Sequence, residues 1–312
     1  MKSLHTLKKS TIALLLGTAL LTACGDEKTQ VASTNIGGDD GVFTIAYAPN
    51  ESTPASADAR KGLAKDLEKY LGCKVEEIQS TDYNAIVESL RTGKAEMAYM
   101  GSQALALGRS RTKIEPIAMK AANGIKENAI YHSVFITQSD NHAINSLADF
   151  AGKTIAFVDP GSTSGNLVPT AEIINQLADL KLTSDALHTN KKFFEAVSFS
   201  GSHQAGLQAV IKGDVDIAPI SDQILASEIE HGNASKDSVK IVYESAPIPA
   251  ECVVVAEQVS EENKKKLQDF LVKYDNEDYF SNVIKLPKSR FVEASMADYE
   301  KIIELNKIIN EL

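Results

Sequence analysis

The feature that most constrains the fold of this chain is a pair of similar segments, residues 87–105 and 207–225, which align without gaps. Each reads as a helix that ends at a glycine, followed by a short buried strand and a loop at the carboxyl end of that strand. Ligands of open α/β sheets bind beyond those carboxyl ends. The repeat therefore predicts two α/β lobes that face each other across a ligand cleft. The matched positions are Gly93 with Gly213, Glu96 with Asp216, Ala98 with Ala218, and Gln103 with Gln223.

The rest of the chain alternates between strand-like and helix-like patterns. Residues 43–47 and 74–79 read as strands, and Asp82 is placed to cap a further helix. Between the two strands, apolar residues recur at helical spacing from Leu63 and stop at Gly72. This alternation predicts an α/β fold with mostly parallel sheets.

Two extended runs, residues 131–137 and 247–255, are expected to carry the chain from one lobe to the other. Residues 41–135 and 247–312 would then form the first lobe, and residues 136–246 the second. Two crossing strands form a natural hinge.

The beginning of the chain predicts export and a lipid anchor. A basic start precedes an apolar stretch, residues 11–21, which is too short to span a bilayer. Leu21-Thr-Ala-Cys24 then reads as the cleavage site of a lipoprotein signal peptide. We expect residues 1–23 to be that signal peptide, Cys24 the lipidated N-terminus and residues 24–40 a flexible tether. The alternative, an ordinary signal peptide with a chance cysteine, is disfavoured by the small residues before the cysteine. The protein would thus lie on the extracytoplasmic face of the cell membrane.

The mature chain is acidic, because loss of the three lysines before the cleavage site takes its formal charge from −10 to −13. Such a surface argues against nucleic acids and anionic membranes as partners. Cys73 and Cys252 leave a disulfide open, and we favour two buried thiols. Neither cysteine lies in a metal-binding motif, so we expect no metal and no cofactor. We also expect a monomer.

The segment Asp159-Pro-Gly-Ser-Thr-Ser-Gly165 lies between a strand-like run and a helix-like run. Three hydroxyl side chains therefore sit where a helix begins, next to unpaired backbone N–H groups and the positive end of the helix dipole. This arrangement suits a tetrahedral oxyanion such as phosphate or a phosphonate. The alternative is that Ser162 or Thr163 only caps the helix, for which one hydroxyl would be enough.

This segment, together with Gly201-Ser-His203, Tyr131-His-Ser-Val134 and Ser245-Ala-Pro-Ile-Pro249, resembles the phosphate/phosphite/phosphonate-binding proteins of ABC transporters. The resemblance runs in order from about residue 43 to about residue 274. It implies a type II periplasmic-binding-protein fold that closes on a small phosphorus oxyanion. It also implies delivery of that ligand to an ABC permease and its ATPase.

The resemblance further implies which side chains meet the ligand. The aminoalkylphosphonate binders of the family carry a glutamate near the ligand's amine where this chain has Gln223. This difference weakens the case for a cationic tail on the ligand, although Glu251 and Asp222 could partly compensate. The phosphorus oxygens would be held by Ser162, Thr163, Ser164 and His203, and the cleft would be walled by Tyr83, Tyr131 and Glu251.

The residues themselves support some of these roles. His203 follows Ser202, which we expect to cap a helix, and a neutral or protonated imidazole could donate to an oxyanion. The alternative is a solvated histidine in the first turn of that helix. Glu251 could accept the hydrogen of a protonated phosphonate while repelling sulfate, or could be a surface acid near the hinge. Further candidates at strand ends of the first lobe are Tyr47, Glu51, Tyr99 and Ser102.

Two other functions compete with solute transport. Ser164, His203 and Asp222 could form a hydrolase triad, but residues 161–165 depart from Gly-x-Ser-x-Gly because Thr163 is central. We therefore expect that the protein is not an enzyme. A ligand-presenting sensor for a membrane receptor kinase would use the same trap, and the sequence does not separate it from a transport protein.

Overall fold

The structure, a computed structural model, describes residues 36–38, 40–51 and 54–311. The expected signal peptide, the lipidated Cys24 and nearly all of the tether lie outside these residues. None of the helices in the described ranges has the length and apolar character that crossing a membrane requires.

The first lobe is built on a six-stranded sheet with the strand order β13-β4-β12-β3-β1-β2. β1 pairs in parallel with β2 and β3, whereas β12, β4 and β13 add antiparallel ladders. The expectation of mostly parallel sheets is therefore wrong for half of this sheet, because strands from the last third of the chain return to it. The strands are β1 (Val42–Tyr47), β2 (Lys74–Gln79), β3 (Met97–Met100), β4 (Ile114–Ala122), β12 (Cys252–Ala256) and β13 (Ser289–Glu293).

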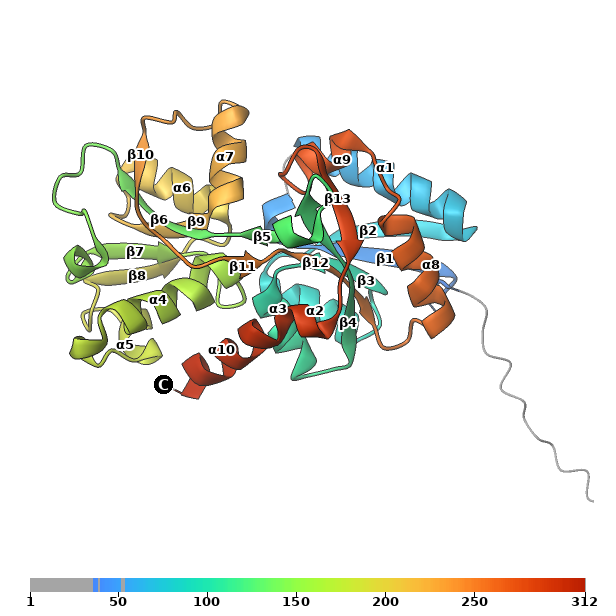
Figure 1. The fold of residues 1–312 in the computed structure, drawn as a ribbon, viewed down its shortest axis with the longest axis horizontal. Coiled ribbons are helices and arrows are strands. Elements are labelled where there is room, and N and C mark those ends of the chain that lie inside the picture. Colours follow the sequence, from blue (N-terminus) through green and yellow to red (C-terminus); the bar gives the residue numbers. More distant parts are fainter. Residues whose placement is uncertain (1–35, 39, 52–53, 312) are drawn as a thin grey trace, which may run out of the picture. The chain divides into compact units, whose positions relative to one another are not determined.

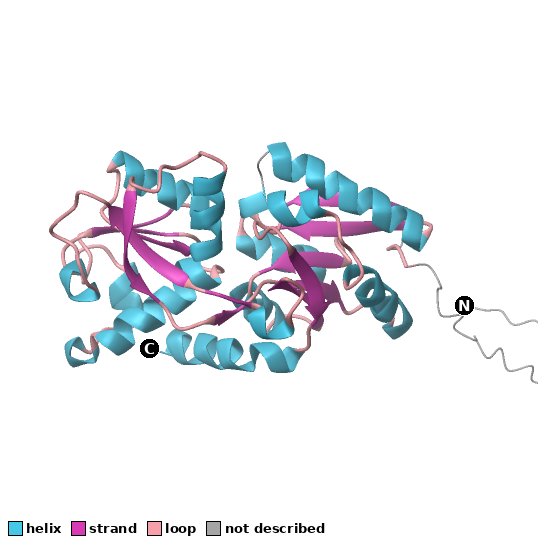
Figure 2. Cartoon of the chain, turned by 45° about the horizontal axis from the view of Figure 1, so that its top comes forward, coloured by secondary structure: helices cyan, strands magenta, loops and turns pink. Residues whose placement is uncertain are grey.

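Helices cover both faces of this sheet (Figure 2). Side chains of successive strand residues point to opposite faces, so β12 sends Val253 and Val255 into one core and Val254 into the other. Burial on both faces explains its unbroken apolar run. The helices are α1 (Pro54–Leu71), α2 (Tyr83–Arg91), α3 (Ser102–Arg109), α8 (Glu261–Leu271), α9 (Glu277–Asn282) and α10 (Glu300–Glu311).

The second lobe repeats this plan on a smaller scale. A three-stranded antiparallel sheet, β10-β6-β9, is joined to the parallel pair β7-β8 by a bridge between Ile155 and Ile217. Its strands are β6 (Ser133–Gln138), β7 (Thr154–Phe157), β8 (Ala196–Phe199), β9 (Ala218–Ser221) and β10 (Val239–Glu244). Its helices are α4 (Val168–Gln176), α5 (Ser184–His188), α6 (His203–Lys212) and α7 (Asp222–Glu230).

The internal repeat predicted from the sequence has a structural counterpart. α2 and α6 each end near a glycine with positive φ, Gly93 at 71° and Gly213 at 75°, and a buried strand follows. The matched carboxylates also make the same kind of hydrogen bond to a neighbouring strand. Glu96 accepts the backbone N–H of Thr44 in β1 at 2.7 Å, and Asp216 accepts that of Thr154 in β7 at 2.8 Å. Each carboxylate thus fixes the neighbouring parallel strand of its own lobe.

Two short antiparallel strands, β5 (Ile130–Tyr131) and β11 (Ile248–Pro249), connect the lobes side by side (Figure 1). The C-terminal helix α10 runs below them and packs Ile302 and Ile309 against Tyr131 and Val168. The crossing therefore consists of two strands and one helix.

Both remaining cysteines are free thiols. Cys252 is buried in β12, and its thiol donates to the Met100 carbonyl oxygen at 3.7 Å. Cys73 is only partly buried, so the expectation of two buried thiols is correct for Cys252 alone.

Asp216→Ala should lower the free energy of unfolding by about 1–3 kcal/mol, because the Thr154 backbone N–H loses its acceptor at a half-buried strand end. The Thr154 hydroxyl loses the same carboxylate at 2.9 Å. Urea titration of the mature protein measures this change. Asp214→Ala, at an exposed position two residues away, is the matched control; equal losses in the two variants would contradict the assigned role.

Candidate functional site: an anion cavity between the lobes

A small cavity lies between the two lobes, with an empty volume of about 330 Å³ including its mouth. Much of that volume is open to solvent at the mouth, so the enclosed part admits only a compact ligand. Both lobes and the crossing strands contribute to its wall. The lining residues are Ala48, Asn50, Tyr83, Tyr99, Met100, Gly101, Tyr131, Ser162, Thr163, Ser164, His203 and Glu251.

Four helical segments begin at this cavity. Tyr83 opens α2, Gly101 precedes α3, Ser162 caps a π-helical turn (Thr163–Leu167) ahead of α4, and His203 opens α6. First-turn N–H groups lack partners within their own helix, and each helix start carries partial positive charge. The backbone alone therefore makes the cavity attractive to an anion.

The three consecutive hydroxyl groups, Ser162 to Ser164, are all buried in the cavity wall. The Ser162 oxygen accepts the Gly165 N–H at 3.1 Å, so this residue is the helix cap, while its own hydroxyl hydrogen stays available. The hydroxyls of Thr163 and Ser164 form side-chain hydrogen bonds with Tyr131. Helix capping therefore accounts for Ser162, but it does not account for the hydroxyl groups of Thr163 and Ser164.

His203 is buried, and its Nδ1 accepts the backbone N–H of Ser221 at 3.1 Å. Burial, helped by the positive charge of Lys120, lowers its pKa from 6.5 to about 3. The ring is therefore neutral at physiological pH, with its proton on Nε2, and it can act as a neutral donor. Of the two protonation states considered from the sequence, the structure favours the neutral one.

Several hydrogen bonds join the lobes around the cavity. The Thr163 hydroxyl oxygen accepts the Gln103 N–H at 2.9 Å. Asn50 donates from Nδ2 to the Tyr83 hydroxyl at 2.5 Å, and its Oδ1 accepts the His203 N–H at 3.3 Å. These contacts link the end of β1 to the start of α6, so Asn50 belongs to the wall of a closed cleft.

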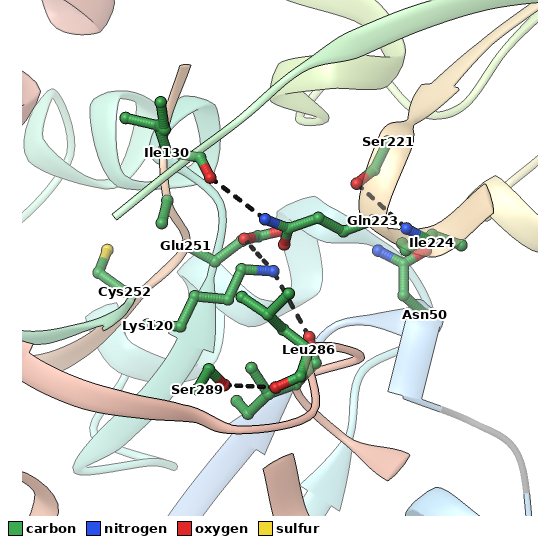
Figure 3. Close-up of polar contacts among 12 residues, drawn as sticks. Asn50, Lys120, Ile130, Ser221, Gln223, Ile224, Glu251, Cys252, Leu286 and Ser289 are labelled. Carbon is green, nitrogen blue, oxygen red and sulfur yellow. Dashed lines mark hydrogen bonds and ion pairs between the residues drawn. The ribbon is translucent and has the colours of Figure 1, made fainter. Parts of the chain in front are cut away.

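Glu251 brings a carboxylate into the cavity wall, and Lys120 pairs with it. The Lys120 Nζ lies 2.7 Å from Glu251 Oε2, as Figure 3 shows. The lysine side chain is only 3% exposed. Figure 3 also shows Gln223, whose Nε2 donates to the Ile130 carbonyl oxygen at 3.2 Å.

Some residues expected at the site lie elsewhere. Asp222 is outside the lining set because its carboxylate accepts the His132 N–H at 3.0 Å. Tyr47 lies in the core, with its hydroxyl 3.4 Å from that of Tyr279. Gln223 and Ser102 do not line the cavity, since Gln223 donates to the crossing strand and the Ser102 hydroxyl faces the Pro249 carbonyl oxygen at 3.5 Å. The backbone of Glu51 ends the short helical turn that carries the lining residue Asn50.

The hypothesis of a hydrolase triad is not supported by the geometry. Nδ1 of His203 faces the backbone N–H of Ser221, so it is not oriented by a carboxylate. The Asp222 carboxylate accepts the backbone N–H groups of His132 and Gln223. Within the described ranges, His, Cys, Asp and Glu also form no group of three or more that could hold a metal ion.

Two residues at the site, Asn50 and Lys120, were not predicted from the sequence. Lys120 interrupts the apolar run of β4, and a charged residue at such a position is rarely buried without a partner. That interruption was a usable signal. Asn50 carried no comparable signal, because its contacts depend on the approach of the second lobe.

Two α/β lobes joined by crossing strands, with an anion cavity between them, define a type II periplasmic binding protein. A family model described as "ABC transporter, phosphonate, periplasmic substrate-binding protein" matches residues 45–299. The chain belongs to this family. Homologues in the family are substrate-binding proteins of ABC importers.

Individual relatives agree with this assignment. The phosphate-import protein PhnD of Mycolicibacterium smegmatis is 34% identical over 72% of this chain and 69% of its own length. The phosphonates-binding periplasmic protein of Escherichia coli is 28% identical over 67% of this chain and 59% of its own length. The structure of PhnD1 from Prochlorococcus marinus in complex with methylphosphonate has a TM-score of 0.72 at 20% identity, covering 87% of this chain and 99% of that chain.

The depressed pKa of His203 predicts a pH dependence of stability. This histidine binds a proton more readily in the unfolded chain than in the folded one. Its contribution to the free energy of unfolding is therefore complete above about pH 6.5 and is lost as the pH falls toward about 3. In His203→Gln, unfolding free energy should fall less steeply over this range, by up to about 1.4 kcal/mol per pH unit. Urea titrations at several pH values measure the difference, in which the other titrating groups cancel. Parallel curves for the two proteins would show that the buried, neutral histidine is misassigned.

Proposed function

We propose that this protein captures a small phosphorus oxyanion outside the cytoplasm and delivers it to an ABC permease and its ATPase. The observation that carries the proposal is the set of neutral donors around one small cavity: three consecutive hydroxyls, a neutral imidazole and four helix starts. The ligands named for the relatives, phosphate, phosphonates and methylphosphonate, belong to this chemical class.

We infer that the oxygens of the ligand are held by Ser162, Thr163, Ser164 and His203, with Tyr83 and Tyr131 on the walls. A hydrogen bond to a charged group contributes roughly 1.5–3 kcal/mol net, so several such bonds can offset the ordering cost of binding. The single lining carboxylate, Glu251, would accept a hydrogen from a protonated oxyanion. Such a contact disfavours sulfate, which offers no hydrogen.

Binding and closure are expected to be coupled. The cavity wall takes residues from both lobes, so a ligand completes its contacts only in the closed form and shifts the population toward it. We propose residues 41–135 with 247–312, and residues 136–246, as the two bodies that move, with the first boundary shifted to just before residue 133 because the whole of β6 pairs within the second lobe. Crossing strands β5 and β11 would then be the hinge.

We also propose that the mature protein is held at the membrane by lipid on Cys24 and is monomeric. The tether, residues 24–40, would let the binding domain reach the permease.

A thermal-shift panel of phosphate, phosphite, methylphosphonate and sulfate tests the proposed ligand class. A bound anion at about 100 times its Kd should raise the unfolding free energy by about 2.7 kcal/mol. Ser164→Ala and His203→Ala should each weaken the best ligand more than about tenfold, or about 1.4 kcal/mol, because each removes one donor. Ser198→Ala, at an exposed serine of the same lobe, is the control. If all three variants bind like the wild type, the assigned site is wrong.

Gly101→Ala should impair closure without unfolding the protein. A Cβ at residue 101 would lie 2.9 Å from the Thr163 hydroxyl oxygen, across the junction between the lobes. We expect at least about tenfold weaker binding of the best anion by calorimetry, since closure would have to displace that hydroxyl. Gly62→Ala is the control, because its Cβ would meet only the Asn276 side chain at 3.7 Å. Unchanged affinity in Gly101→Ala would contradict the closed contact.

A further inference from the structure

The cavity poses an electrostatic problem that its lining residues do not solve. With His203 neutral, Glu251 is the one charged side chain in the lining set, and its charge is negative. A carboxylate in a buried anion site repels the ligand, and a buried carboxylate without a counter-charge tends to take up a proton. Once protonated, it would donate a hydrogen bond instead of accepting one.

Lys120 supplies the counter-charge from outside the lining set. Its backbone N–H donates to the Glu251 carbonyl oxygen at 3.2 Å, and its Nζ lies 2.7 Å from Glu251 Oε2. The two residues are thus held together through both main chain and side chain, where β4 and β12 pair.

Further contacts fix the ammonium group in place. It donates to the Ile284 carbonyl oxygen at 3.4 Å and lies 5.7 Å from the centre of the Tyr131 ring, a cation–π distance. Its charge also acts on His203, which is neutral, and on Asp222, which accepts two backbone N–H groups. The ammonium therefore has Glu251 as its ion-pair partner.

We propose that Lys120 is a positioning residue that keeps Glu251 ionised and oriented as a hydrogen-bond acceptor, so that the cavity prefers oxyanions carrying a P–OH group. This inference rests on the proposed function and adds the ligand's protonation state to it. An ionised Glu251 gains a hydrogen bond from a hydrogen phosphonate and faces bare oxygen in a sulfonate. A neutral Glu251 would donate a hydrogen bond to either ligand, so the site would no longer distinguish a hydrogen phosphonate from a sulfonate.

Methylphosphonate and methanesulfonate form a matched pair for the test. At about pH 5.5 both carry a single negative charge on a tetrahedral head with one methyl group, and only the phosphonate keeps a hydroxyl. The ratio of their dissociation constants therefore reports the acceptor at Glu251. A general loss of donors would weaken both ligands and leave the ratio unchanged.

Isothermal titration calorimetry on the mature wild type should give at least about a hundredfold preference for methylphosphonate. Lys120→Met should reduce the preference to less than about tenfold, and Lys120→Arg should restore most of it because the charge is kept. Glu251→Gln should also lower the preference, since an amide can donate. The double variant should show no further loss beyond Glu251→Gln, because the lysine acts through the glutamate.

The outcomes separate the two levels of the proposal. A selective wild type with an unchanged ratio in Lys120→Met would overturn the role of Lys120 and leave the proposed function intact. A wild type that binds both anions equally would also overturn this inference. If neither anion binds and phosphate and phosphite do not bind either, the proposed function fails first. Should Lys120→Met not fold, Lys120→Gln, checked by circular dichroism, replaces it; a preserved preference there equally contradicts the proposal.

Discussion

The site depends on one property of helices: their first-turn N–H groups have no acceptor within the helix. A helix follows β3 directly at Gly101, and the turn after β7 leads into another at Ser162. These helix starts therefore lie at the carboxyl edge of each sheet, where the lobes meet, and the oxygens of Ser162 and Thr163 accept some of their N–H groups. The hydroxyls of the Ser162–Ser164 segment and the neutral ring of His203 enlarge this set without adding charge. Dipoles that the fold holds in place need little reorganisation when an anion arrives.

Formal charges beside the cavity follow a different rule, because they are paired and mostly buried. Burying an ion pair costs desolvation, and a well-packed apolar pair is often as stable. Stability alone thus gives no reason for Lys120 to interrupt an apolar strand and meet Glu251 at 2.7 Å. A binding site has such a reason, since an acceptor inside an anion cavity distinguishes ligands that carry a hydrogen from those that do not. The pair exchanges some stability for selectivity.

Local signals in the sequence were enough for much of the fold. The glycine at 93, the cap at Asp82 and the cap at Ser202 act within a few residues, and each appears where its pattern predicts it. Long-range pairing was not visible: β4 meets β12, which lies far along the chain, so Lys120 was missed. The clustering of most candidates at one cavity followed from the resemblance and the strand-end rule. Tyr47 was misplaced because strand alternation turns it into the core.

Tyr131 shows why the hinge and the site act as one unit. It lies on crossing strand β5, its hydroxyl bonds to Thr163 and Ser164, and its ring belongs to the apolar cluster that α10 forms with α4. Burial, followed by the nearby charge of Glu251, raises its pKa well above 10, so the hydroxyl keeps its proton and remains a donor. If the lobes open as proposed, Thr163 and Ser164 move away from Tyr131, which also packs in the cluster beneath it. In that proposal, closure is coupled to ligand binding through a side chain of the crossing strand itself.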